Sequence, residues 1–278
     1  ELALDLSWYE NTPSRKTRRG FILDQLGIDT PAAPPSLVRN LRNYGLLRRA
    51  QRRIWGRERM GSIGTVTGDR EFFDTTWQER KPLLYLHGYW QSERYFADAA
   101  DSLRSAVDLN APRAAASAWS EQIAARGESA VGVHVRRGDY VTNPKYAAEY
   151  GALEPEYYRR AAELIAGRVE GPVFFVFSDE PAWARAHLDL PGETIIVEHE
   201  SPVSAATDLS LMSLCEHFIV SNSTFGWWGA WLSERRNSSV VVAPEPWYAG
   251  RSRDPRSIIP ARWETVERTA QKAAPSQS

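Results

Sequence analysis

The feature that most constrains the fold is a series of short, mostly apolar runs that begins at residue 131 and alternates with helical segments. Each run is four or five residues long and lacks the polar alternation of a half-exposed strand, which is typical of strands buried on both faces. The expected strands are residues 131–135, 173–177, 194–197, 217–220 and 240–243. This pattern predicts a parallel sheet in a doubly wound α/β domain.

Helices are expected between these strands. Residues 155–168 show the pattern best, because Pro155 suits a first helical turn and Tyr158, Ala162 and Ile165 recur at helical spacing. The other expected helices are residues 181–188, 205–215 and 225–233. In such a domain the ligand binds beyond the carboxyl ends of the strands, so the residues that follow each strand are the informative ones.

Composition and charge exclude several classes of protein. Hydrophobic residues make up 42% of the chain and charged residues 25%, as in an ordinary globular protein. A net charge of −1 argues against a general nucleic-acid binder, and no apolar run approaches the roughly 18 residues of a membrane span. The single cysteine, Cys215, cannot form an internal disulfide, so a reducing compartment is compatible and we expect a cytoplasmic protein.

The chain has 278 residues, which is enough for two domains. We expect an N-terminal domain over residues 1–125, a C-terminal domain over residues 126–268 and a frayed polar tail over residues 269–278. The boundary falls where the sequence changes from an irregular pattern to the regular alternation of strands and helices.

Two basic clusters lie in the N-terminal domain, at residues 15–19 and, more loosely, between Arg39 and Arg59. The spacing of the second cluster predicts an amphipathic helix with a solvated basic face. The alternative is a surface that contacts anionic lipid or a polyanionic sugar, which would make the protein peripheral to a membrane.

Polar residues follow three of the expected strands. They are Arg-Arg-Gly-Asp at residues 136–139, Ser-Asp-Glu at residues 178–180 and Ser-Asn-Ser-Thr at residues 221–224. Arginines, acids and small hydroxyls suit a nucleotide and its phosphates. Residues 221–224 come directly before a helix, where free N–H groups favour an anion; simple helix capping uses the same groups and remains an alternative.

Metal and cofactor motifs are missing from the sequence. It contains no glycine-rich phosphate loop, no dinucleotide fingerprint, no Cys/His cluster and no Asp-x-Asp after a strand. The Glu-His-Glu at residues 198–200 suits either a cation or a solvated loop. We expect no metal ion and no cofactor, so arginine must neutralise the diphosphate of a nucleotide.

Several blocks carry a family resemblance. Residues 134–140 read His-Val-Arg-Arg-Gly-Asp-Tyr and look like the His-x-Arg-Arg-x-Asp signature of fucosyltransferases. Further matching blocks are residues 4–9, 88–96, 175–180, 208–217 and 221–231, the last containing Asn-Ser-Thr-Phe-Gly-Trp-Trp-Gly-Ala-Trp. From residue 4 to about 247, the chain resembles the α1,2-fucosyltransferases of glycosyltransferase family 11.

The resemblance implies a fold and a reaction. The fold would be the GT-B arrangement, with two Rossmann-type domains facing a cleft. The reaction would be metal-independent, inverting transfer of L-fucose from GDP-β-L-fucose to the 2-hydroxyl of a β-galactoside-terminated glycan. The family begins with a strand and a glycine-rich loop whose place lies before Glu1, so the N-terminal domain is expected to be incomplete. The alternatives are a fucosyltransferase of different linkage and a catalytically silent nucleotide-sugar or carbohydrate-binding protein.

The resemblance also implies roles for the residues around the first strand. Arg136 would bind the diphosphate through two parallel hydrogen bonds, and the alternative is a structural ion pair with Asp139. Arg137 should point to the opposite face and brace Asp139 or a neighbouring loop. His134 would contact guanine or ribose, or be a satisfied core histidine.

The other donor-binding candidates follow the second and fourth strands. The carboxylate of Asp179 or Glu180 would accept from guanine, and the alternative for Asp179 is helix capping. Asn222, Ser223 and Thr224 would complete the donor site, with Ser223 and Thr224 on phosphate oxygens.

The catalytic base and the acceptor site are less well defined. Asp139 is the candidate base that the motif offers, and its alternative role is to hold the two arginines. Trp90 and Trp247 are candidates for stacking on an acceptor sugar, and core burial is the alternative for each.

Overall fold

The structure is a computed structural model that describes residues 2–10, 20–41, 63–67, 83–234, 239–250 and 258–268. The basic cluster at residues 15–19 and the expected tail at residues 269–278 lie outside the described residues. The second basic cluster lies outside them too, apart from Arg39.

A six-stranded parallel sheet forms the centre of the larger part of the molecule. Its strand order is β5-β4-β3-β6-β7-β8, the 3-2-1-4-5-6 order of doubly wound nucleotide-binding sheets. The strands are β3 (Ala130–Val135), β4 (Val173–Ser178), β5 (Glu193–Ile196), β6 (His217–Ile219), β7 (Val241–Glu245) and β8 (Glu264–Glu267). The α/β fold and all five expected strands are confirmed, and β8 is an addition.

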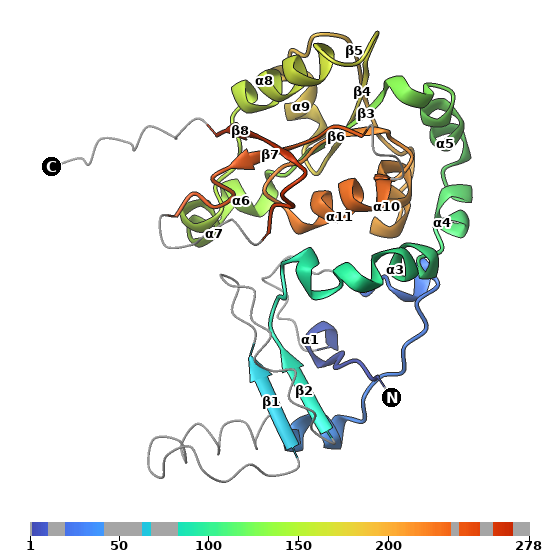
Figure 1. The fold of residues 1–278 in the computed structure, drawn as a ribbon, viewed down its shortest axis with the longest axis vertical. Helices are drawn as coiled ribbons and strands as arrows, with labels where there is room; N and C mark the ends of the chain where they lie inside the picture. Colours follow the sequence, from blue (N-terminus) through green and yellow to red (C-terminus); the bar gives the residue numbers. More distant parts are fainter. Residues whose placement is uncertain are drawn as a thin grey trace, which may run out of the picture.

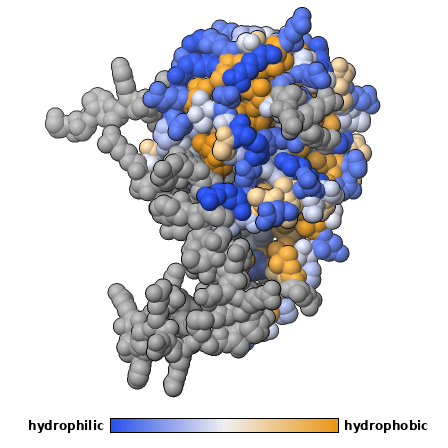
Figure 2. Space-filling model, viewed as in Figure 1, coloured by the Kyte–Doolittle hydropathy of each residue, from blue (hydrophilic) through white to orange (hydrophobic). Residues whose placement is uncertain are grey.

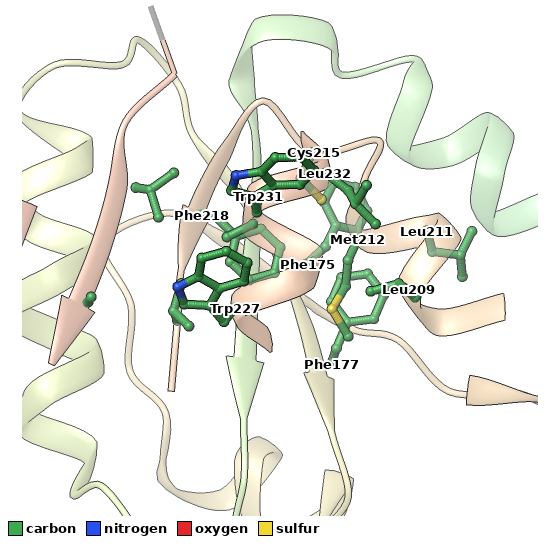
Figure 3. Close-up of a cluster of buried hydrophobic side chains, with 14 of the residues drawn as sticks. Phe175, Phe177, Leu209, Leu211, Met212, Cys215, Phe218, Trp227, Trp231 and Leu232 are labelled. Atoms are coloured by element: carbon green, nitrogen blue, oxygen red, sulfur yellow. The ribbon is translucent and has the colours of Figure 1, made fainter. Parts of the chain in front are cut away.

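Helices cover both faces of this sheet because its strands are apolar on both sides. On one face α8 (Pro155–Ala166) and α9 (Pro181–His187) pack against alternate residues of β3, such as Val131 and Val133. On the other face α5 (Ser117–Ala124), α10 (Ala205–Met212) and α11 (Thr224–Ser233) complete the second core. Figure 3 shows α11 placing Trp227 and Trp231 in that second core, near Phe175 and Phe218.

The four expected helices are confirmed within one or two residues at most ends, and the 205–215 helix ends earlier, at Met212. Two short helices after β3 were not expected: α6 (Gly138–Thr142) and α7 (Pro144–Glu149). They lie near the carboxyl ends of β3 and β7 (Figure 1). The residues after β3 therefore form ordered structure rather than an open loop.

The remaining described elements come before β3. A two-stranded parallel sheet joins β1 and β2, and it lies below α3 in Figure 1. The elements are α1 (Ser7–Glu10), η1 (Asp24–Leu26), β1 (Ile63–Thr67), β2 (Leu83–His87), η3 (Glu93–Tyr95), η4 (Ala97–Ala99), α3 (Ala100–Ala106), α4 (Asn110–Ala114) and η5 (Gly127–Ser129). Residues 35–41 are also helical.

Side-chain contacts join the two parts of the molecule. The ring of Phe96 stacks on Trp228 with centroids 5.5 Å apart. The hydroxyl of Tyr248 donates to Gln91 Oε1 over 3.0 Å, and Arg262 pairs with Glu93. The segment from residue 88 to residue 96 thus lies against the six-stranded sheet and its helices.

The visible face of the larger part mixes hydrophilic and hydrophobic side chains, and much of the smaller part is drawn in grey (Figure 2). Among the described residues, no helix has both the length and the apolar character that a membrane crossing requires.

Candidate active site

The strand order places β3 beside β6 in the middle of the sheet, with the chain turning outward in opposite directions from this pair. In doubly wound sheets the carboxyl ends of such a pair form the ligand-binding crevice. The segments that leave β3 and β6 are residues 136–139 and 221–224. Two of the three polar segments expected from the sequence therefore meet at this point, and Asp179 joins them from β4.

Arg136 lies between two carboxylates at the end of β3. Its Nε and Nη2 donate to Asp139 Oδ1 over 3.1 and 2.5 Å, and its Nη1 lies 3.0 Å from Asp179 Oδ2. Burial lowers the pKa of Arg136, but the Asp179 and Asp139 carboxylates more than offset this, so its pKa is raised. The guanidinium is charged and held in one orientation. The ion pair with Asp139, expected as the alternative role of Arg136, is present.

N–H groups of Arg136 remain for a ligand. A guanidinium has five N–H groups, and the two hydrogen bonds to Asp139 use two of them. The Asp179 carboxylate faces only the Nη1 side. The side chain is 21% exposed, so part of it reaches solvent. A fork of this kind suits a phosphate oxygen pair.

Arg137 points to the opposite side from Arg136, as expected. Its Nε donates to Glu180 Oε2 over 3.0 Å, and its guanidinium lies 3.9 Å from the centroid of the Trp183 ring. Of the two expected roles for Arg137, the structure supports bracing of the neighbouring loop rather than of Asp139. Glu180 is thereby an ion-pair partner of this arginine.

Asp179 connects the two arginines. Its Oδ1 accepts from the backbone N–H of Arg137 over 2.9 Å, and its Oδ2 pairs with Arg136. Burial raises the pKa of the Asp179 carboxyl, against the opposing effects of that N–H and of the Arg136 charge. The capping alternative is wrong, because α9 has Glu180 at its N-cap position and no side-chain capping bond.

Gly138 explains how Asp179 approaches so closely. A Cβ atom at this position would lie 2.6 Å from Asp179 Oδ2, which is closer than any real contact of that kind. With a larger residue here, the carboxylate would have to shift from its place between the two arginines. Gly138 was not singled out from the sequence, although it lies inside the Arg-Arg-Gly-Asp block.

His134 is a buried, neutral imidazole. Its Nδ1 lies 2.6 Å from Ser221 Oγ, and burial together with the nearby Arg136 charge lowers its pKa to about 3. Gly226 of α11 packs directly on the ring, since a Cβ there would be 2.6 Å from Nδ1. The geometry matches the alternative expected for His134, a satisfied core histidine that joins β3 to α11.

The segment after β6 ends at the start of α11. Ser223 is the N-cap residue but makes no side-chain capping bond, and Thr224 is the first helical residue. Asn222 instead donates from Nδ2 to the carbonyl oxygens of Tyr150 and Gly151, over 2.7 and 3.1 Å. The amide of Asn222 therefore holds a loop, while the first turn of α11 keeps backbone donors and a positive dipole end for an anion.

A cavity of about 350 Å³ opens beside these residues, at the carboxyl ends of β4 and β5. It is lined by Phe177, Ser178, Pro181, residues 197–203 and Asp208. Within it, His199 Nε2 lies 2.8 Å from Asp208 Oδ1. No group of three or more His, Cys, Asp or Glu residues in the described part of the chain is arranged to hold a metal ion.

The two tryptophans expected at the acceptor site differ in burial. Trp247 is 1% exposed and belongs to the hydrophobic core, so packing accounts for it and its faces are covered. Trp90 is half-buried, packs edge-on against Tyr95, and has a φ of +46° that non-glycine residues rarely adopt. Its neighbour Tyr89 is 59% exposed.

Sequence reasoning missed other residues of this region. Tyr140 hydrogen-bonds across to the β6 loop, and Asp208 lines the cavity. Both stand inside blocks that matched the family, but nothing in their spacing shows that residues so far apart converge. For Tyr140 the available signal was its position in the segment that follows β3, whereas Asp208 lies within α10 and its sequence position carried no such signal.

Similarity to known proteins identifies the family of this chain. The family model described as Glycosyl transferase family 11 matches residues 70–267. The chain is 29% identical to an alpha-1,2-colitosyltransferase of Escherichia coli, covering 96% of this chain and 89% of that protein. It is 27% identical to the O-antigen biosynthesis glycosyltransferase WbnK of Escherichia coli, covering 91% of this chain and 86% of that protein.

A mammalian relative matches a shorter region. The galactoside alpha-(1,2)-fucosyltransferase 1 of Sus scrofa is 31% identical over 163 residues, which cover 55% of this chain and 44% of that protein. The resemblance read from the sequence blocks is confirmed. A nucleotide-sugar donor and a glycan acceptor follow from membership. The chain belongs to glycosyl transferase family 11.

Proposed function

We propose that this glycosyltransferase moves L-fucose from GDP-β-L-fucose to the 2-hydroxyl of a galactoside, with inversion and without a metal ion. The observation that carries the proposal is the placement of Arg136 at the end of β3, beside the segment that leads into α11. A cation and a helix N-terminus at one point suit a diphosphate leaving group.

The diphosphate is assigned to Arg136, Ser223 and Thr224. Negative charge on the diphosphate grows as the bond to the sugar breaks, and a fixed guanidinium stabilises that charge without rearranging. Asp139 and Asp179 hold Arg136 in this orientation. The N–H groups at the first turn of α11 add neutral donors.

The base of the nucleotide is assigned to the cavity lined by Asp208. Asp179 and Glu180, the candidates from the sequence, are engaged by Arg136 and Arg137. The Asp208 carboxylate contacts His199 rather than an arginine and lines the adjacent cavity, and a carboxylate can accept two parallel N–H donors such as those of guanine. The cavity volume of about 350 Å³ suits a small ligand.

The proton of the acceptor hydroxyl needs a base within hydrogen-bond reach. Asp139 stays our candidate, since it is one of the two carboxylates that contact Arg136 and it belongs to the Arg-Arg-Gly-Asp segment. In this role Asp139 would exchange part of its contact with Arg136 for the acceptor hydroxyl when the diphosphate binds the arginine.

For the architecture we propose the two-domain GT-B arrangement, with the acceptor on the N-terminal side near Trp90. The two parallel sheets support it, since each has the strand arrangement of a Rossmann-type unit or part of one. A nucleotide-activated colitose is the second candidate donor, because a colitosyltransferase is 29% identical over most of both chains.

One assay separates these possibilities. The protein is incubated with GDP-β-L-fucose, or with a nucleotide-activated colitose, and a panel of β-galactosides, and the product linkage and anomeric configuration are read by NMR. An α1,2-fucosyl product supports the proposal. Colitosyl transfer alone would identify the second donor as the substrate. A product with a different linkage would indicate a fucosyltransferase of different specificity, and GDP binding without turnover would indicate a catalytically silent binding protein.

A binding experiment tests the assigned base pocket separately. Inosine diphosphate lacks the exocyclic amino group of guanine, so the wild type should bind GDP more tightly than inosine diphosphate. Asp208→Asn should lose about tenfold in GDP affinity and much of this discrimination, measured by calorimetry. Equal affinities of wild type and variant for GDP would remove Asp208 from the site.

A further inference from the structure

Tyr140 contacts both segments that leave the central pair of strands. It lies on α6, the helix that begins directly after the two arginines, and its hydroxyl donates to the backbone carbonyl of Asn222 over 3.2 Å. The Arg136 guanidinium lies 5.7 Å from the centroid of its ring. One side chain therefore touches the segment after β3 and the segment after β6, although Tyr140 and Asn222 are 82 positions apart in the sequence.

Asn222 is fixed from its other side by the loop that precedes α8. Its Nδ2 donates to the carbonyl oxygen of Tyr150 over 2.7 Å. The Tyr150 ring in turn stacks on Tyr140, with centroids 5.0 Å apart and planes within 10°. Tyr140, Tyr150 and Asn222 form a closed triangle in which each residue contacts the other two.

This triangle resists deformation more than a single contact would. Asn222 is 1% exposed, so its carbonyl oxygen needs a partner inside the protein. The Tyr150 carbonyl also accepts from Arg268 Nη1 over 2.9 Å, which anchors the triangle to the end of β8. A shift of the β6 segment relative to Arg136 would break these bonds together.

We propose that Tyr140 is a positioning residue for the transfer reaction. Its hydroxyl fixes the start of α11 at a set distance from Arg136, so that both face the same diphosphate. This inference rests on the proposed function. A displacement of about 1 Å between such groups costs up to a hundredfold in rate, so the loss of one positioning bond should appear in turnover.

Tyr140→Phe tests the inference because it removes the hydroxyl and keeps the ring that stacks on Tyr150. Tyr146→Phe is the matched control: the Tyr146 ring also contacts Tyr150, 6.1 Å away, and its hydroxyl makes no hydrogen bond with another described residue. For wild type and both variants we would measure kcat, the KM for the donor and Tm.

We expect Tyr140→Phe to lower kcat about tenfold, with KM changed less than threefold and Tm close to that of the wild type. Misplacement of a group that stabilises the transition state lowers kcat more than it raises KM. Tyr146→Phe should match the wild type in all three measurements.

Three results would overturn the inference. Unchanged kcat in Tyr140→Phe would show that the hydroxyl positions nothing. A large fall in Tm, or a variant that does not fold, would show that the hydroxyl serves stability instead. Equal losses of kcat in Tyr140→Phe and Tyr146→Phe would show that turnover is sensitive to any change in α6 and α7, not to the Tyr140 hydroxyl in particular. A wild type that neither transfers sugar nor binds GDP would instead overturn the proposed function itself.

Discussion

The Nδ1 atom of His134 lies 2.6 Å from the hydroxyl oxygen of Ser221. This contact joins the end of β3 to the second residue after β6, so it crosses the central pair of strands where the ligand is expected. It also puts a neutral imidazole, rather than a cation, behind Arg136. Of this histidine and arginine, only Arg136 therefore carries a positive charge.

Replacing Arg136 with lysine should leave the fold intact and lower kcat/KM by about a hundred- to a thousandfold. An ammonium cannot hold Asp139 and Asp179 and also present a fork to the diphosphate. Kinetics and Tm are the measurements, and Arg126→Lys is the control, since Arg126 makes a comparable ion pair with Glu193 on the surface. Wild-type efficiency in a folded Arg136→Lys protein would remove Arg136 from the reaction.

Gly138→Ala should disturb the same arginine without changing any charge. The added Cβ would lie 2.6 Å from Asp179 Oδ2, so this oxygen must shift from the position in which it pairs with Arg136. We expect kcat/KM to fall about tenfold or more. Gly167→Ala is the control, because the nearest atom to its Cβ is 3.5 Å away and its backbone is helical. Equal activity of the two variants would show that the position of Asp179 does not matter.

Stability should fall as the pH drops below about 6.5. Burial lowers the pKa of His134 to about 3 in the folded protein, whereas a histidine in the unfolded chain titrates near 6.5. Between these values the unfolded chain binds the extra proton, so the unfolding free energy decreases with falling pH. The loss for this one group is about 2 kcal/mol at pH 5.

Urea unfolding at pH 8 and pH 5 measures this effect. His134→Asn should show a smaller difference between the two pH values than the wild type. Burial also lowers the pKa of His217, so part of the dependence should persist in the variant. An identical pH dependence in wild type and variant would contradict a neutral, buried His134.

Activity should survive treatment with EDTA. Arg136 supplies positive charge where the diphosphate is expected, which is the role a divalent ion has in other glycosyl transfers. Initial rates with EDTA, with added Mg²⁺ and with added Mn²⁺ are the measurements, and a metal-dependent phosphatase under the same conditions is the control. Loss of activity with EDTA, restored by either ion, would refute stabilisation by arginine alone.

The strands could be predicted because burial on both faces leaves a continuous apolar signal, as at residues 173–177. The sixth strand, β8, was missed because Glu264–Glu267 reads Glu-Thr-Val-Glu, with one apolar residue, and lies at the edge of the sheet with only alternate residues half-buried. The helix α6 was missed because a helix of five residues is too short to show a clear periodicity of apolar residues. Short or half-exposed elements are set by tertiary contacts.

The location of the candidate site could be predicted from the sequence, but the ion pairs and hydrogen bonds among its side chains could not. Arg136 and Asp179 were both expected at the carboxyl edge of the sheet, since each follows a strand. Asp179 contacts both arginines, and Arg137 pairs with Glu180. These contacts depend on the directions of side chains from two loops more than 40 residues apart in the sequence. Linear spacing cannot distinguish a carboxylate that binds guanine from one that holds an arginine.

The contact between the two parts of the molecule should depend on Arg262. Its Nη1 lies 2.7 Å from both carboxylate oxygens of Glu93, and its Nε and Nη2 bind the two oxygens of Glu234 over 2.9 and 2.6 Å. One guanidinium thus joins the segment before α3 to the end of α11. Lysine has a single charged nitrogen and cannot bind both carboxylates in this way.

Arg262→Lys should therefore lower the unfolding free energy by about 1 kcal/mol, which corresponds to roughly 2–4 °C in Tm for a chain of this size. The Arg262 side chain is 44% exposed, so salt should screen its ion pairs. The difference in unfolding free energy between variant and wild type should therefore shrink when NaCl is raised from about 20 mM to about 500 mM. Arg168→Lys is the control, because Arg168 makes one pair with Glu264 in the part of the chain described. If both variants lose the same amount at low salt, the bridging geometry of Arg262 contributes nothing beyond a single surface ion pair.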